Sequence, residues 1–596
     1  MRYTLVPLVL WTTITIGCAE PSPVSNDDPP TPPTPSRAAT PDDDTRQRLG
    51  AQWDKLKDAA AARAQKASPV SAKGPDLSLT HNEEMRQALQ KLYKSRPQGT
   101  IFINPDGTAS PQGIDAIALT EKAWTHGIPA PEGWPNIDAL LKRWRQGPKT
   151  LSDAFHAPLQ PQDLQRHWDK EAENTLDTSL LTSQSLQHLD TIESLPAQLA
   201  ANQRALDTAL VLGVWMLARA IDAKAVPCPV WPRKRRRACK RARKAQQNTL
   251  LETPESMLAR VAPRHPDYQK LRNAFERYVN ITDAGGFPAL PTDTPKELGP
   301  GQRHPSVTAL RARLNAEGYP AAPNKDADAD LYDAPLSEQV RAFQFTRGLR
   351  MTGLLDKPTQ KALQIPAAHL VEQLQLNLVR WHRSRARHED YYVRVSITRY
   401  QVQLVDGPEV LSRIKAVVGK PWKQTPRFNG VITHLETHPW WWGLADDPKR
   451  VPPGPANPLG PLVFRVQPRH LLIYLHGTNE PRLLDKPYRA YSHGCIRMKD
   501  PGELGELVLD RDPGKATGKD MRNYMAGKRR TRRLMLANPL PVLFEYTTAY
   551  VDDDTGHVHF TPDIYRQDAA HRARWKLPVD PHKTWTKPAP QNESAN

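Results

Sequence analysis

The chain has 596 residues, more than one hydrophobic core usually supports, so its length excludes a single small domain and predicts several folded units. Apolar residues make up 38% of the sequence, which is ordinary for globular folding, but 59 prolines exceed what packed elements hold and predict linkers and loops. The formal net charge of +18 indicates anionic partners, and nucleic acid is the first class to consider.

The chain begins with the layout of a secretory signal. Arg2 precedes a mainly apolar run from Leu5 to Ile16, which is too short to span a bilayer permanently. Cys18 follows a small residue and precedes a polar stretch, so residues 1–17 resemble a lipoprotein signal peptide whose cysteine becomes the lipidated first residue. Thr15 stands where such signals usually have leucine, so cleavage without lipidation stays open.

The expected export determines which anionic partners the basic residues can meet. Fourteen basic residues lie in two runs, 233–244 and 528–533. An exported protein meets anionic wall polymers and lipid phosphates before DNA, so no nucleic acid partner is expected. Solvated loops are the simplest interpretation of both runs. We expect a periplasmic protein anchored to the outer membrane through Cys18, because Ala19 rather than aspartate follows that cysteine.

In an exported protein, the four cysteines have three different expected roles. Cys18 is the lipidation site. Cys228 and Cys239 lie close together, and in an oxidising compartment they are expected to form a disulfide that contributes roughly 3 kcal/mol. Two buried free thiols are the alternative. Cys495 is left alone, and a lone cysteine in an exported protein is a candidate reactive thiol.

The first half of the chain predicts a tether and a helical domain. Residues 18–75 are expected to form the lipidated start, a Pro-rich disordered tether and an Ala-rich helix, because residues 20–44 have almost nothing to bury. Residues 76–297 carry helical periodicity broken by turns and predict a helical scaffold domain. The apolar stretch Ala209–Ala218 within it is bounded by charges, which favours a buried core helix over a membrane span.

Residues 298–366 predict a small bundle of three helices, followed by a connecting helix at 367–388. The apolar residues that define the bundle at helical spacing are Val307, Leu310, Leu314, Val340, Phe343 and the stretch Thr359–Leu363. The phrases V-T-A-L-R-A-R-L-N-A-E-G-Y and T-G-L-L-D-K-P-T-Q-K-A-L resemble the peptidoglycan-binding domain family. The resemblance implies a module that holds cell wall. An arbitrary three-helix module is the alternative.

From Tyr391 the apolar period changes to two, which predicts β-structure. The alternation slips by one residue before Tyr400 and so predicts a turn between two strands. Further β-rich segments at Leu471–Leu475 and Val542–Tyr546 predict a mainly antiparallel sheet domain over residues 389–567, with 568–596 as a C-terminal tail. The fold class expected for the whole chain is multidomain α+β.

The stretches Y-L-H-G-T at 474–478 and Y-S-H-G-C-I-R-M at 491–498 supply one thiol and two imidazoles. A cysteine thiol is mostly protonated at neutral pH, so a nucleophilic Cys495 needs a base or a positive field, which His476, His493 or Arg497 can provide. Gly494 allows close approach of a substrate carbonyl, whose oxygen the N–H groups of Gly494 and Cys495 could hold as an oxyanion hole. A lone cysteine beside one histidine is usually structural. Two histidines, a small neighbour and export favour a reactive site here.

The same stretches, H-G-T followed by S-H-G-C-I-R-M, resemble the signature of the L,D-transpeptidase catalytic domain family. A-V-V-G-K before Thr425, V-P-P-G-P-A-N-P-L-G from Val451 and T-T-A-Y-V-D-D-D-T-G from Thr547 extend the resemblance to its long multidomain members. The resemblance implies a scaffold that needs no cofactor and no metal. It also implies Cys495 as nucleophile, His476 as general base, the Gly477 carbonyl as its orienting partner, and a pocket lined by Tyr474, Ser492, His493, Gly494 and Arg497.

The activity implied by the resemblance is acyl transfer on peptidoglycan stem peptides, which serve as donor and acceptor. Cys495 would expel D-alanine from a tetrapeptide stem and form a thioester, which an amine of a second stem resolves into a 3-3 cross-link. Hydrolysis by water and anchoring to a protein lysine are alternatives that use the same chemistry. A non-catalytic wall-binding lipoprotein is an alternative of another class. The stretch between Trp440 and Pro455 is short beside the substrate lid of some relatives, which leaves acceptor recognition open.

Two histidines compete for the role of base. His493 is nearer in sequence to Cys495, but His476 follows the apolar run Leu471–Leu475, which predicts a buried strand, and the end of a strand fixes an imidazole better than a loop does. We therefore expect His476 to be the base. We also expect its imidazolium to stabilise the Cys495 thiolate.

Overall fold

The computed structural model describes residues 75–80, 82–94, 101–104, 108–131, 134–146, 183–224, 265–321, 328–384, 390–444, 447–527 and 529–577. The chain divides into one unit of residues 1–63 and 155–193 and a second of residues 64–154 and 194–596. Only the beginning of one helix is described in the first unit, so the fold below is that of the second. The expected signal peptide, Cys18, the tether, the pair Cys228 and Cys239, and the first basic run lie outside the described residues.

Helix α7 (Ser183–Lys224) forms the core of the helical scaffold. It packs against α2 (Glu83–Lys94), α3 (Pro111–Glu121) and α4 (Ile137–Gln146). The apolar stretch Ala209–Ala218 is buried in this core, which confirms the prediction of a core helix. No helix of the described residues is long and apolar enough to cross a membrane.

Helix α14 (Ala367–Arg383) lies in the core of the molecule, where the sequence predicted only a connector. One side packs against α10 (Pro266–Asp283) and against residues of the sheet domain such as Leu543. Leu376 and Val379 on another side meet the end of α7 and Trp575. A surface helix usually has a single apolar stripe, but α14 carries apolar residues on several faces and is therefore buried on several sides.

The segment expected as a C-terminal tail begins with a helix, α17 (Asp568–Trp575). Trp575 packs against α14, and Asp568 accepts a hydrogen bond from Arg380 of that helix at 2.7 Å. The polar composition of this segment concealed these two anchoring residues. The expectation of a tail is therefore corrected for residues 568–575.

The three predicted helices of the small bundle are present as α11 (Pro305–Ala316), α12 (Ala334–Thr346) and α13 (Lys357–Leu363). Each has a proline at its first or second position, and the side chain of the residue before each helix caps it. The predicted apolar faces are confirmed, since all of these side chains are fully buried: Val307, Leu310, Leu314, Val340 and Phe343.

Glu317, directly after α11, joins the bundle to its neighbours. It is only 1% exposed, and its carboxylate accepts hydrogen bonds from Arg313 at 2.7 Å, from the Tyr278 hydroxyl at 2.6 Å and from Arg347. Burial alone would raise the pKa of this carboxyl, but Arg347 and Arg313 lower it below its usual value. Tyr278 belongs to α10, so a buried charge network fixes the bundle to the scaffold.

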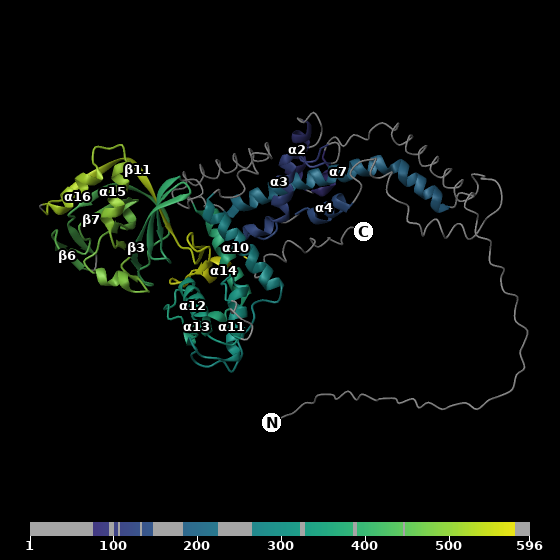
Figure 1. The fold of residues 1–596 in the computed structure, drawn as a ribbon. Helices are drawn as coiled ribbons and strands as arrows, with labels where there is room; N and C mark the ends of the chain where they lie inside the picture. Colours follow the sequence, from purple (N-terminus) through teal and green to yellow (C-terminus); the bar gives the residue numbers. More distant parts are fainter. Residues whose placement is uncertain are drawn as a thin grey trace, which may run out of the picture. The chain divides into compact units, whose positions relative to one another are not determined.

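Residues 391–545 contain a mixed sheet of nine strands, β1 (Tyr391–Ser396), β2 (Gln401–Asp406), β3 (Glu409–Gly419), β4 (Phe428–Thr437), β7 (Leu462–Gln467), β8 (Leu475–His476), β9 (Ala490–Ser492), β10 (Ile496–Met498) and β11 (Arg532–Glu545). Their order is β10-β8-β7-β4-β11-β1-β2-β3-β9, and an added pairing of β10 to β3 closes the sheet on itself. Most pairings are antiparallel, as predicted, and β1–β11, β8–β10 and β3–β9 are parallel. Helices α15 (Pro501–Arg511) and α16 (Gly518–Ala526) pack against the core of this sheet, and Figure 1 labels both helices together with β3, β7 and β11.

Two hairpins stand beside this sheet. Strands β5 (Trp441–Leu444) and β6 (Asp447–Val451) pair in the stretch compared above with a substrate lid. Strands β12 (Ala549–Val551) and β13 (Val558–Phe560) pair after β11 and pack against α10 and α14. In the second basic run, Arg532 and Arg533 are exposed at the start of β11, so part of that run is strand and not loop.

The predicted strand Leu471–Leu475 is wrong over most of its length. A 3₁₀ helix, η6 (Arg469–Leu471), follows β7, and Leu472 after it has a φ of 53° and is 67% exposed. Only Leu475 pairs, as the first residue of β8. The chain turns after β7, so only the end of the apolar run reaches a neighbouring strand. Such a run has no period that would reveal where pairing begins.

The buried network predicts a large effect of Glu317→Gln. The substitution leaves Arg313 and Arg347 buried without a neutralising charge, so the free energy of unfolding should fall by about 3 to 5 kcal/mol. The pKa of Glu317 is below its usual 4.5, so its contribution is present above that pH and is lost as the pH falls through the lower value of the folded state.

Calorimetric unfolding from pH 7 to pH 3 would measure both effects. Glu338→Gln on α12 is the matched control, because this side chain is 71% exposed and its pairing with Arg341 is a surface contact. Equal melting temperatures for the two variants would contradict the role given to Glu317.

Candidate active site

The register of β8 and β10 places the motif side chains. The two strands are parallel neighbours, with Ile496 opposite Leu475 and Arg497 opposite His476. Side chains alternate along a strand, and directly opposite residues point to the same face. Leu475 and Ile496 enter the hydrophobic core, so Cys495, Arg497 and His476 share the other face. The alternation therefore directs the apolar side chains of the two strands into the core and the polar motif side chains to the opposite face.

His476 is buried and held by its own neighbour. Its Nδ1 lies 2.6 Å from the carbonyl oxygen of Gly477, so an N–H at Nδ1 donates to this carbonyl, and the backbone of Leu459 is a second partner of the ring. Burial lowers the pKa of His476 to about 3, and the charge of Arg497 acts in the same direction. The imidazole is therefore neutral at neutral pH and can accept a proton.

The Cys495 thiol is partly exposed, and its Sγ donates to the carbonyl oxygen of Leu472 at 3.4 Å. Burial raises the pKa of this thiol, while the backbone of Tyr474 and the charge of Arg497 lower it in part. A thiol of raised pKa and an imidazole of lowered pKa are both neutral at neutral pH. The expected stabilisation of a thiolate by a His476 imidazolium is therefore wrong for the resting protein.

Two hydroxyl groups hold the loop before Cys495. Ser492 donates to the carbonyl oxygen of Cys495 at 2.6 Å and accepts the N–H of Gly494 at 3.0 Å. Thr425 donates to the carbonyl oxygen of Gly494 at 2.7 Å and accepts the N–H of Gly419 at 2.9 Å. The Gly494 N–H is thus already engaged, which corrects its expected part in an oxyanion hole.

Gly494 itself is required by this geometry. Its φ is +122°, a conformation that residues with a side chain rarely adopt, and an added Cβ would lie 3.1 Å from a methyl carbon of Ile473. The loop can therefore present Cys495 only if the preceding residue is glycine.

Further charged groups near these residues come from other parts of the chain. Arg497 pairs with Glu480 at 2.5 Å, and Arg465 of β7 lies 4.9 Å from the centre of the Tyr474 ring and pairs with Glu436 at 2.6 Å. Sequence reasoning missed the roles of Thr425, Glu480 and Arg465, because no local pattern marks a partner that comes from another part of the chain. His493, expected in the pocket, is exposed, in contrast to buried His476. Within the described ranges no group of His, Cys, Asp and Glu is arranged to hold a metal ion.

Comparisons with known proteins agree on two domains. Residues 390–515 match the family of the L,D-transpeptidase catalytic domain, and residues 303–363 match the family "Putative peptidoglycan binding domain". A "Putative L,D-transpeptidase" of Haemophilus influenzae is 30% identical over 96 residues, which are 16% of this chain and 19% of that protein. A protein of the same description from Bacillus licheniformis is 30% identical over 120 residues, 20% of this chain and 60% of that protein. The chain therefore spans less than two thirds of the length of either relative.

Solved structures give a weaker comparison. The L,D-transpeptidase from Xylanimonas cellulosilytica is 17% identical and covers 43% of this chain and 100% of its own, with a TM-score of 0.17. That from Stackebrandtia nassauensis is 14% identical and covers 43% and 96%, with a TM-score of 0.19.

The neutral pair predicts how Cys495 reacts with iodoacetamide. Only the thiolate is alkylated, so the rate should reach half its maximum above pH 9.0, the usual cysteine value. His476→Ala should not move this midpoint upward, because the imidazole carries no charge to lose. Arg497→Gln should raise it, because the charge of Arg497 lowers the pKa of Cys495.

Mass spectrometry of the peptide that contains Cys495 measures alkylation at this residue alone. His493→Ala serves as the control and should leave the midpoint unchanged, because His493 is exposed and is not among the groups that shift the thiol. A midpoint near or below neutral pH that rises in His476→Ala would instead show a preformed ion pair.

Proposed function

We propose that this chain, which carries an L,D-transpeptidase catalytic domain and a peptidoglycan-binding domain, is a cysteine-dependent L,D-transpeptidase that cross-links peptidoglycan. One observation carries the proposal. In the register of β8 and β10, Arg497 lies opposite His476 and Cys495 directly precedes β10. This register supports a thiol and a buried neutral imidazole on one face of the sheet, with a positive charge from Arg497. These are the nucleophile and the base that acyl transfer requires.

In the first half-reaction, Cys495 Sγ attacks the carbonyl carbon of the third residue of a tetrapeptide stem while Nε2 of His476 accepts the thiol proton. The carbonyl oxygen becomes an oxyanion, for which the Cys495 N–H is the candidate donor, since that of Gly494 is engaged. The intermediate then collapses. The C–N bond to D-alanine breaks, the leaving amine takes the proton from His476, and the third residue remains on Cys495 as a thioester.

In the second half-reaction, an amine of a neighbouring stem attacks the thioester and gives a proton to His476. The C–S bond breaks, and the thiolate of Cys495 takes that proton back. The product is a 3-3 cross-link. The peptidoglycan-binding domain supports a stem peptide as acceptor over water or a protein lysine, because a wall-binding module keeps the enzyme among stems.

The remaining expectations form part of this proposal. Peptidoglycan lies outside the cytoplasmic membrane, so the protein acts there. The signal at 1–17 and Cys18 support a lipid anchor in the outer membrane. The expected tether after Cys18 would connect this anchor to the folded domains. The helical scaffold then presents the peptidoglycan-binding domain, which Glu317 fixes to it.

Digestion of sacculi tests the proposal. Purified sacculi rich in tetrapeptides, incubated with the protein and then cut by a muramidase, should yield new 3-3 dimers detectable by mass spectrometry. Cys495→Ala should yield none, and His476→Ala should slow their formation by about 10²- to 10⁴-fold.

His493→Ala is the control, because it also removes a histidine near Cys495. It should slow the formation of dimers less than His476→Ala does. Tripeptides without dimers would show hydrolysis instead of cross-linking, and release of bound protein would show reversal of protein anchoring. Dimers formed at the normal rate by Cys495→Ala would contradict the proposed chemistry.

A further inference from the structure

A cavity of about 350 Å³ lies away from the candidate active site, and none of its lining residues belongs to the motifs around Cys495. Its walls come from the end of α14, the residues around the start of β4, the end of β11 and α17. Four arginines line it, Arg380, Arg383, Arg427 and Arg574, together with a single carboxylate, Glu545. The cavity therefore has a strong excess of positive charge.

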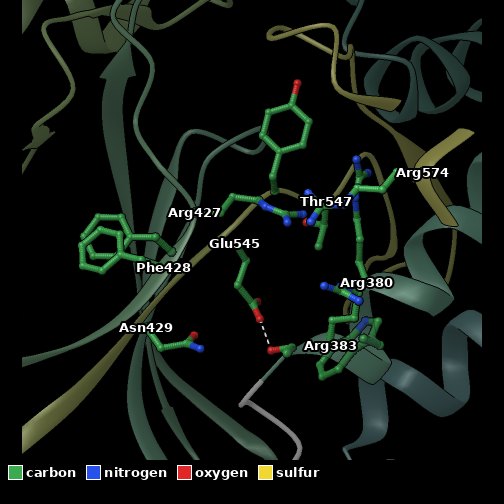
Figure 2. Close-up of a pocket in the computed structure, with 12 residues that line it drawn as sticks. Arg380, Arg383, Arg427, Phe428, Asn429, Glu545, Thr547 and Arg574 are labelled. Atoms are coloured by element: carbon green, nitrogen blue, oxygen red, sulfur yellow. Dashed lines mark hydrogen bonds between the residues drawn. The ribbon is translucent and has the colours of Figure 1, made fainter. Parts of the chain in front are cut away.

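The carboxylate does not neutralise this excess, because it already has partners. Glu545 accepts a hydrogen bond from Ser384, drawn as a dashed line in Figure 2, and pairs with Arg394 outside the cavity at 3.4 Å. Arg380 pairs with Asp568 at 2.7 Å, yet its buried Nε has no hydrogen-bond partner among the described residues.

Two of the arginines are available to a ligand. Within the described part of the chain, no ion pair is recorded for Arg427 or Arg574, and both residues are exposed to solvent. Figure 2 shows the Arg427 side chain reaching from the strand side toward the side on which Arg380 and Arg574 project from the helices. Guanidinium groups from separate parts of the fold therefore line one cavity.

The electrostatics of Arg427 agree with this arrangement. Arg427 is exposed as a whole residue, but the protein around its guanidinium reduces the hydration of that group and lowers its pKa to about 10, and the charges of Arg380 and Arg383 lower it further. These neighbours disfavour the cation, and a bound anion would have the opposite effect. The aromatic side chains of Trp381 and Phe428 add apolar surface to the same walls.

We propose that this cavity is a binding site for a small organic anion, whose carboxylate or phosphate is held by Arg427 and Arg574. Guanidinium groups bind both oxyanions through paired N–H donors. The volume suits a molecule the size of a sugar, since small-molecule sites begin at about 300 Å³. The site is separate from Cys495, so the inference does not depend on the proposed catalysis.

Calorimetric titration tests the site with three amino sugars that differ in charge: N-acetylmuramic acid, N-acetylglucosamine 6-phosphate and neutral N-acetylglucosamine. The full chain with Cys495→Ala is used, so that no turnover contributes heat. At least one acidic sugar should bind and the neutral sugar should not. The comparison of the two acidic sugars tells carboxylate from phosphate. Arg427→Gln and Arg574→Gln should each weaken binding by about tenfold or more.

Arg143→Gln on α4 is the matched control, because it removes the same charge from an exposed arginine outside the cavity. It should leave the affinity unchanged. The acidic sugar should also raise the melting temperature of the parent protein but not of Arg574→Gln, an exposed change that folding should tolerate. Equal weakening by Arg143→Gln, equal binding of the neutral sugar, or no binding of either acid would overturn the proposal.

Discussion

The pairing of two very short parallel strands decides where the reactive side chains lie. With Ile496 opposite Leu475, the apolar residues of both strands enter the core, and His476 and Cys495 are left on the other face. A slip of one residue would exchange the two sets, because side chains alternate with a period of two. The hydrogen bonds of Ser492 and Thr425 to the loop before Cys495 therefore hold the register as well as the loop.

Burial then sets the resting protonation states of the two side chains to which we assign the chemistry. It lowers the pKa of His476 and raises that of Cys495, so both shifts disfavour a thiolate beside an imidazolium. The proton should move to the imidazole as sulfur attacks and not beforehand. Arg497 adds positive charge that favours the developing thiolate, but Glu480 pairs with it and limits this effect.

The sequence revealed elements with a clear period and residues in a dense motif. The bundle helices and strands β1 and β2 follow their apolar spacing, and the motif residues His476 and Arg497 lie opposite each other on the paired strands β8 and β10. The sequence failed where the decisive contact is distant. The uniform run Leu471–Leu475 has no period, and the partners of α14, which are α10, the sheet domain, the end of α7 and Trp575, lie far apart in the sequence. The engaged N–H of Gly494 and the arginine-lined cavity likewise depend on residues that only folding brings together.

Trapping the acyl group on the protein tests the central claim most directly. The full chain is mixed with a tetrapeptide stem that lacks an acceptor amine, and the protein is then digested at low pH, where thioesters persist, for mass spectrometry. The account predicts a tripeptide acyl group on the peptide that contains Cys495, with release of D-alanine in equal amount. Release of D-alanine without an adduct on Cys495, or at an unchanged rate in Cys495→Ala, would contradict it.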